Sequence, residues 1–286
     1  LNSWCGLSSP IWSSPLETQI DFWRQIISVL RDIGTPYFVI GDSHSHLYRR
    51  IIPLSNGLLI PIALICYASS AKGLPNAQSR SGAGMRLSAL AAALNSYGSD
   101  VPMLFNFGQV DVEFVFNFER IKNEDFSFSI ERFDAFCDVS ATAYMDFIGA
   151  NFIGRKVHIM GLLPPALVDD AWLKGYVNAH VVATESSQAL DDVLDGAKNL
   201  EIPSLLERTR LHQRYNELLR MKACGHNFEF VDSLPHFLGK DDVLDPKFIP
   251  THKGADHHLE EPPSIATAEG LIKRILNTAV HDCPQR

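Results

Sequence analysis

The spacing of apolar side chains changes along the chain between a pattern typical of helices and a pattern typical of buried strands. Helices are expected where apolar residues recur at helical spacing or where alanine and leucine predominate, at residues 15–33, 85–97, 205–221 and 266–280. Strands are expected at residues 36–40, 58–67, 101–107, 156–163 and 228–232, and the first two are short continuous apolar runs, typical of strands with both faces buried. Residues 126–153 are also mostly helical in pattern. The chain is therefore predicted to alternate helices with strands.

The first predicted helix carries signals for both of its ends. Ser14 and Glu17 have the spacing of a capping box, in which each side chain accepts a hydrogen bond from a backbone N–H at the start of a helix. Pro15 suits the first helical position, because a proline lacks the N–H that would go unbonded there. Gly34 is the residue type expected just beyond a helix end. We therefore expect this helix to start at Pro15 and to stop before Gly34.

Strands that alternate with helices at intervals of roughly 30–60 residues favour a parallel sheet with helices on both faces. We therefore predict an α/β protein with three layers (α/β/α) and a mostly parallel sheet of five strands. No internal repeat or Gly/Ser linker divides the chain, so residues 1–286 are interpreted as a single domain. Residues 1–34 are predicted to form an N-terminal helical extension. Residues 166–200 have no clear pattern and are interpreted as a loop or cap.

Composition and charge narrow the classes of partner. Hydrophobic residues make up 46% of the chain and charged residues 20%, which is the balance of an ordinary soluble globular protein. The formal net charge of -8 argues against nucleic acid and anionic membranes as main partners, since both attract clustered positive charge. The longest apolar run, residues 58–68, is too short to span a bilayer and contains Pro61. We expect neither a nucleic-acid partner nor a membrane span.

Cysteine usage and the first residues favour a reducing compartment. The five cysteines are an odd number, and no close pair has the spacing of metal ligands. Cys66 and Cys137 lie in apolar or helical runs and are expected to be buried free thiols. The first residues lack the basic and apolar regions of a signal peptide, so we expect a cytoplasmic location. The pattern does not predict an oligomeric state.

Polar or glycine-rich segments follow several predicted strands, which is where open α/β sheets bind their ligands. They are Gly41-Asp42-Ser43, Ser81-Gly82-Ala83-Gly84 and Gly108-Gln109-Val110-Asp111. A serine hydroxyl becomes a good nucleophile when a base takes its proton and a third group orients that base. Ser43 is therefore the candidate nucleophile.

The candidate base lies far downstream, just before the last predicted helix. Asp256 can orient the imidazole of His258, and His258 can reach a neighbouring serine. His257 is an alternative base, and His252 is a weaker one. His257 is expected to point elsewhere if His258 points inward.

The oxyanion that forms when an ester carbonyl is attacked needs hydrogen-bond donors. The candidates are the backbone N–H groups of Ser43 and Gly82 and the side-chain amide of Gln109. The histidines near Asp256 could suggest a metal site, but other ligands with matching spacing are absent from the sequence. We therefore predict no metal and no cofactor.

These segments, taken in order, resemble the SGNH or GDSL-like hydrolase family. The family's blocks are similar to Phe38-Val39-Ile40-Gly41-Asp42-Ser43-His44, to Gly82, to Phe107-Gly108-Gln109-Val110-Asp111 and to Asp256-His257-His258-Leu259. The resemblance covers about residues 36–275. It implies a flavodoxin-like three-layer fold in which Ser43 is the nucleophile, His258 the base and Asp256 the acid that orients it.

Two blocks depart from the family pattern. The third block usually carries an Asn that donates to the oxyanion, and here that position is Val110, which cannot donate. Gln109 can substitute only if a turn redirects its side chain, because neighbouring side chains on a strand point to opposite faces. The last block usually reads Asp-x-x-His, whereas here it reads Asp256-x-His258.

A subgroup linked to bacterial polysaccharide modification is similar in having Gly-Asp-Ser-His and an altered third block. The resemblance therefore implies a serine esterase that acts on an acyl ester, in particular an acetyl ester, of a carbohydrate. A carbohydrate O-acyltransferase is one alternative. A non-catalytic carbohydrate-binding module on the same fold is another, because of the altered third and last blocks.

Overall fold

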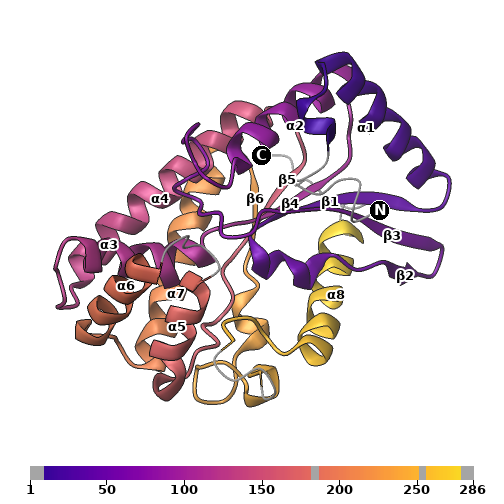
Figure 1. Ribbon diagram of the computed structural model, residues 1–286. Helices are drawn as coiled ribbons and strands as arrows, with labels where there is room; N and C mark the ends of the chain where they lie inside the picture. Colours follow the sequence, from indigo (N-terminus) through magenta and orange to yellow (C-terminus); the bar gives the residue numbers. More distant parts are fainter. Residues whose placement is uncertain (1–9, 182–186, 251–255, 278–286) are drawn as a thin grey trace.

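A single mixed sheet forms the centre of the structure, a computed structural model that describes residues 10–181, 187–250 and 256–277 (Figure 1). Within these residues the strand order is β2-β3-β1-β4-β5-β6. Neighbouring strands pair in parallel, except that β2 pairs antiparallel with β3. The strands are β1 (Thr35–Gly41), β2 (Ile52–Leu54), β3 (Gly57–Ile65), β4 (Met103–Asn106), β5 (Val157–Met160) and β6 (Glu229–Val231).

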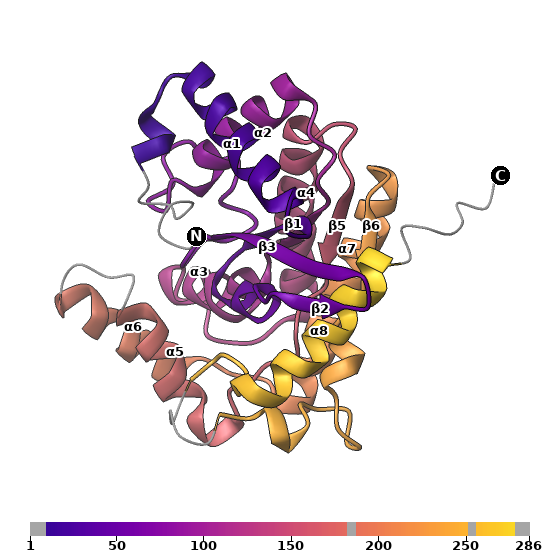
Figure 2. The same cartoon turned by 90° about the vertical axis from the view of Figure 1, so that its right-hand side faces the viewer.

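Helices cover both faces of this sheet (Figures 1 and 2). The longer ones are α1 (Leu16–Arg31), α2 (Ala83–Tyr97), α3 (Phe116–Lys122), α4 (Ile130–Asn151), α5 (Trp172–Val181), α6 (Ser187–Asn199), α7 (Leu205–Gly225) and α8 (Glu261–Asn277). The short turns are η1 (Pro10–Ser13), η2 (Ser43–Tyr48), η3 (Asp111–Val115), η4 (Asp169–Ala171), η5 (Leu234–Phe237) and η6 (Pro246–Phe248). Helices α1, α2, α4 and α7 share one hydrophobic core with the sheet, and α8 belongs to a second core on the opposite face.

Strand β1 shows how the sequence produces these three layers. Phe38 and Ile40 point into the core shared with α1 and α2, whereas Tyr37 and Val39 point into the core shared with α8. All four side chains are completely buried. A strand that is buried on both faces is apolar at successive positions. This explains the continuous apolar run at residues 36–40. The predicted three-layer α/β fold is confirmed.

The sheet has six strands within the described residues, not the five predicted, because the sequence pattern missed β2. β2 contains only three residues, one of which is Pro53. A proline lacks a backbone N–H, so in sheets it is confined mostly to edge strands. β2 is such an edge strand, and its short polar connection to β3 made the segment look like a loop.

The predicted capping box of the first helix is wrong. Helix α1 begins at Leu16, after Pro15, and no side chain caps its first turn. The Ser14 hydroxyl donates instead to the carbonyl of Pro10 at 3.3 Å, inside the preceding η1 turn. The helix packs on the core, in which its Trp23 is completely buried.

Residues 166–200, which have no clear sequence pattern, contain helices α5 and α6. Seven side chains there and in η3 form a third apolar cluster: Phe114, Leu167, Trp172, Tyr176, Val193, Ala197 and Leu200. The helices bury apolar side chains in this small core. Their role as a cap over a ligand stays a prediction.

Two further expectations concern cysteines and membranes. Cys66 and Cys137 are buried free thiols, as predicted, whereas Cys224 is an exposed one. Cys5 and Cys283 lie outside the described residues. Among the helices that the structure describes, none combines the length and the apolar character needed to cross a bilayer.

Two helical glycines predict opposite effects of the same substitution. A Cβ atom added at Gly84 in α2 would lie 1.8 Å from the Leu74 carbonyl oxygen, whereas one added at Gly270 in α8 would meet nothing within 4 Å. Gly84→Ala should lower the free energy of unfolding by about 1–3 kcal/mol or more, because backbone must move. Gly270→Ala should raise it by about 0.5–1 kcal/mol through helix propensity. Urea denaturation measures both, and equal effects would contradict this packing of α2.

Candidate catalytic site

Ser43 lies directly beyond the carboxyl end of β1, at the first position of η2. The chain must turn sharply there, and Gly41 makes the turn possible. A Cβ atom at Gly41 would lie 2.0 Å from the Ser45 hydroxyl and 2.1 Å from the Asn106 carbonyl of neighbouring β4. Ser43 is half-buried. It lies at the carboxyl edge of the parallel strands, which is where open α/β sheets bind their ligands.

A chain of hydrogen bonds joins Ser43 to the predicted base and acid. Ser43 Oγ lies 2.9 Å from His258 Nε2, and His258 Nδ1 lies 2.8 Å from Asp256 Oδ1. The hydrogen bond from His258 holds the pKa of the Asp256 carboxyl well below its usual range. A carboxylate on Nδ1 fixes that nitrogen as the N–H donor, which leaves a lone pair on Nε2 to accept the serine proton. The structure therefore brings together the three residues that the sequence singled out.

The short spacing of the last block has a local explanation. Asp256 Oδ1 accepts two hydrogen bonds from the same residue, one from the His258 backbone N–H at 2.9 Å and one from its ring Nδ1–H. A side-chain oxygen that accepts from the backbone two residues on closes a compact turn. The Asp-x-His spacing is thus sufficient to hold the His258 imidazole against the Asp256 carboxylate.

The same arrangement occurs a second time, around Ser43. Asp42 Oδ1 accepts from the His44 backbone N–H at 2.9 Å and lies 3.0 Å from His44 Nδ1. Burial alone would lower the pKa of His44, but the charge and hydrogen bond of Asp42 outweigh it and raise that pKa. The ring of His44 lies 4.9 Å from the ring of His258, centroid to centroid. Sequence analysis missed this pair, although its Asp-x-His spacing matches that of the last block.

His257, the alternative base, packs against neighbouring rings, whereas His258 makes the hydrogen bond with Ser43 Oγ. The ring of His257 packs edge-on against Phe114 of η3, with 5.0 Å between ring centroids, and against His44. Burial, followed by the positive charge of neighbouring imidazoles, lowers the pKa of His257 to about 2. Its imidazole is therefore neutral. His252, the weaker alternative, lies outside the described residues.

Asp111 of the third block anchors the loop that follows β3. It is completely buried and accepts hydrogen bonds from the backbone N–H of Ala71 at 2.6 Å, from that of Lys72 at 2.9 Å and from the Ser140 hydroxyl at 2.8 Å. Burial outweighs these bonds and raises the pKa of Asp111 to about 6. The anchored loop starts beside the nucleophile, because the Cys66 N–H donates to the Gly41 carbonyl at 2.7 Å.

Gln109, a predicted oxyanion donor, makes its hydrogen bonds to groups of two loops. Strand β4 ends at Asn106, and the turn at Gly108 (φ +115°) redirects Gln109 toward the neighbouring strand. Its amide Nε2 donates to Glu113 Oε1 at 2.6 Å and lies 3.3 Å from the Leu163 carbonyl, and its Oε1 accepts from the Leu163 N–H at 3.0 Å. The amide therefore joins the loops after β4 and β5.

Gly82, the other predicted donor, also has a different partner. Its N–H donates to the Ser79 carbonyl at 2.9 Å in the turn before α2. The turn needs a glycine, because φ is +58° there. An oxyanion role for Gly82 or Gln109 would require these hydrogen bonds to break. Of the three predicted donors, the Ser43 N–H is the one at the nucleophile itself.

An open hollow is bordered by Asp256 and seven further residues. Its lining is Arg50, Pro250, Asp256, Leu259, Glu260, Glu261, Pro262 and Ile265. The Arg50 guanidinium is part-exposed and lies 3.9 Å from the Glu261 carboxylate. The hollow therefore offers charged and polar groups next to the hydrogen-bonded chain.

Comparisons with known proteins find likenesses in structure only. No protein-family model matches the chain, and no curated protein sequence matches it. A GDSL-like lipase from Bacteroides thetaiotaomicron is similar over 91% of this chain and 98% of its own, with 15% identity and a TM-score of 0.41. A carbohydrate acetylesterase from Sinorhizobium meliloti is similar over 85% of this chain and 99% of its own, with 14% identity and a TM-score of 0.42. At these values the likenesses carry no argument about activity, which must come from the contacts of Ser43.

The anchoring by Asp111 predicts a graded loss of stability. In Asp111→Asn an amide NH₂ replaces one acceptor oxygen and faces a backbone N–H, so the free energy of unfolding should fall by about 1–3 kcal/mol. The variant Ser140→Ala removes one of the three donors to Asp111, together with the 2.9 Å hydrogen bond between the Ser140 and Tyr215 hydroxyls, and should cost about 1 kcal/mol. Urea denaturation of both variants measures the difference. A smaller loss for Asp111→Asn than for Ser140→Ala would show that the carboxylate does not hold the loop.

Proposed function

We propose that this protein is a serine hydrolase that cleaves acyl esters, with Ser43 as its nucleophile. The observation that carries the proposal is the continuous chain from Ser43 Oγ through His258 to Asp256 Oδ1, with hydrogen-bond distances of 2.9 Å and 2.8 Å. Nucleophile, base and orienting acid in hydrogen-bond contact are the geometric signature of nucleophilic catalysis. A binding module would have no need to activate a hydroxyl in this way.

The contacts define how the reaction would proceed. Ser43 Oγ attacks the ester carbonyl carbon while His258 Nε2 takes the hydroxyl proton. The carbonyl oxygen becomes an oxyanion that accepts a hydrogen bond from the Ser43 N–H. When the bond to the leaving alcohol breaks, the imidazolium returns its proton to that alcohol and an acyl-serine remains.

The second half repeats these steps with water. His258 takes a proton from the water as its oxygen attacks the acyl carbon, and it then protonates Ser43 Oγ as the carboxylic acid leaves. If a sugar hydroxyl replaces the water, the same residues transfer the acyl group to the sugar. Asp256 stabilises the imidazolium in both halves, because its carboxylate lies against Nδ1–H. The steps require no cofactor.

For the substrate we propose an acyl ester, in particular an acetyl ester, of a carbohydrate. The resemblance of Gly41-Asp42-Ser43-His44 and of the altered third block to enzymes of polysaccharide modification supports this class. The hollow beside Asp256 supports it as well, because the charged groups of Arg50 and Glu261 are suited to sugar hydroxyls. Charged donors and acceptors form stronger hydrogen bonds with hydroxyls than neutral groups do.

Replacement of the nucleophile tests the proposed activity. Ser43→Ala should lower kcat for p-nitrophenyl acetate by about 10⁴-fold or more, because no other hydroxyl accepts the acyl group. The matched control is Ser55→Ala at an exposed turn position, which should keep full activity. Full turnover by Ser43→Ala would refute the proposed function.

Arg50 tests the proposed substrate class. Arg50→Ala should raise KM for an acetylated xylo-oligosaccharide by about tenfold, the value of one hydrogen bond to a charged group. It should leave kcat/KM for p-nitrophenyl acetate unchanged, since that ester is too small to reach the hollow. Arg49→Ala is the matched control, because Arg49 does not line the hollow. Equal losses on both substrates would argue against carbohydrate binding at this place.

A further inference from the structure

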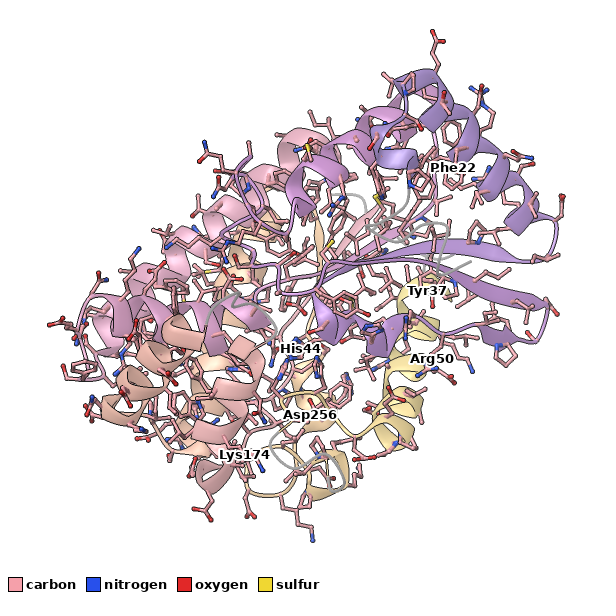
Figure 3. All side chains as sticks on the ribbon, in the orientation of Figure 1. Phe22, Tyr37, His44, Arg50, Lys174 and Asp256 are labelled. Atoms are coloured by element: carbon pink, nitrogen blue, oxygen red, sulfur yellow. The ribbon has the colours of Figure 1, made fainter. Side chains whose placement is uncertain are left out.

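Three histidine side chains form a cluster that includes the proposed base, His258. Among the residues that the structure describes, His44, His257 and His258 form one group in which a ring nitrogen from each lies within 4.8 Å of the others. Figure 3 labels His44 and Asp256, which mark the two chain segments that meet here. The ring of His257 lies 4.0 Å from the ring of His258 and 5.3 Å from that of His44, centroid to centroid.

Each of the two Asp-x-His units holds one imidazole by its Nδ1, as a carboxylate holds a histidine that binds a metal. Asp42 accepts from Nδ1 of His44, and Asp256 accepts from Nδ1 of His258. Histidines that bind zinc almost always donate their other ring N–H to a carboxylate, a carbonyl or water, which fixes the tautomer and raises ligand basicity. In both units Nε2 is thus the nitrogen left for a ligand.

His44 gives an independent reason to expect a ligand. The residue is only 4% exposed, and its Nε2 is buried without a hydrogen-bond partner. The His257 backbone carbonyl lies close enough to contribute to the raised pKa of His44, but not in the geometry of a hydrogen bond. A buried polar atom without a partner costs free energy, so its retention beside a reactive serine points to a partner that binds there.

The charges around the cluster are suited to a cation. The carboxylates of Asp42 and Asp256 both lie directly behind the imidazoles, so a divalent ion would meet compensating negative charge. Imidazole nitrogen is a preferred ligand of zinc, at about 2.0–2.1 Å. The three rings would have to move closer together to reach these distances. His257 and His258 are part-exposed, so their rings have room to move.

We propose that His44, His257 and His258 bind a Zn²⁺ ion, and that this ion inhibits the enzyme reversibly. The ion takes the Nε2 lone pair of His258, so this nitrogen no longer accepts the proton of Ser43. Any proton on Nε2 of His44 is released to solvent when the ion binds. The fourth position is open to water or to Ser43 Oγ, as in zinc sites with three protein ligands. The inhibition rests on the proposed function, whereas the binding does not.

Calorimetric titration of the chelator-treated full chain with Zn²⁺ tests the binding. We expect one ion per chain in the wild type and in Ser43→Ala, and at least tenfold weaker binding in His44→Ala and in His257→Gln. The matched control is His226→Ala, whose ring pairs with Asp146 outside the cluster and whose loss should leave binding unchanged. If His44→Ala does not fold, as circular dichroism would show, His257→Gln alone decides. Absence of zinc binding, or binding that both cluster variants retain, would overturn the site.

Esterase assays with added Zn²⁺ test the inhibition separately. Turnover of p-nitrophenyl acetate should fall with a midpoint equal to the calorimetric Kd and return when a chelator removes the ion. Zinc that binds at the cluster without any loss of turnover would overturn the inhibitory role and leave the binding site standing. A chain without esterase activity would refute the proposed function, and the calorimetric result would still decide the zinc site.

Discussion

The candidate site depends on a single carboxylate oxygen. Asp256 Oδ1 accepts both the backbone N–H and the ring Nδ1–H of His258, so one atom fixes the turn of the chain and the tautomer of the imidazole. Without that double acceptance, an Asp-x-His segment would have no reason to present Nε2 to Ser43. Ser43 comes from the N-terminal part of the chain, far from Asp256 in sequence. It follows β1, which lies between β3 and β4 in the sheet, so the serine is held near the middle of the sheet edge.

The rest of the edge is held by buried polar side chains that do not touch the nucleophile. Asp111 ties down the loop after β3, and Gln109 joins the loops after β4 and β5. Buried groups of this kind cost free energy unless each donor and acceptor has a partner. Asp111 has three partners, so its burial rigidifies the loop beside Ser43. The third block therefore acts here as a scaffold for the site.

The sequence predicted much of this fold, and its failures have physical causes. The strands with continuous apolar runs were recognisable because both faces of the sheet are buried, whereas β2 was too short and contained Pro53. Ser14 has the spacing of a cap, but its hydroxyl is used by a preceding turn that no pattern announces. The triad residues were predictable from their order along the chain. The partners of Gln109 and the pairing of Asp42 with His44 depend on tertiary contacts and local turns that the pattern of residues does not specify.

The central claim is that His258 activates the hydroxyl of Ser43. Reaction with a fluorophosphonate probe, followed by peptide mass spectrometry, tests it most directly, because only an activated serine attacks the phosphorus. The account predicts one adduct per chain, located on Ser43 in the wild type and lost in His258→Ala. Absence of an adduct on Ser43, or equal labelling of the wild type and His258→Ala, would contradict it.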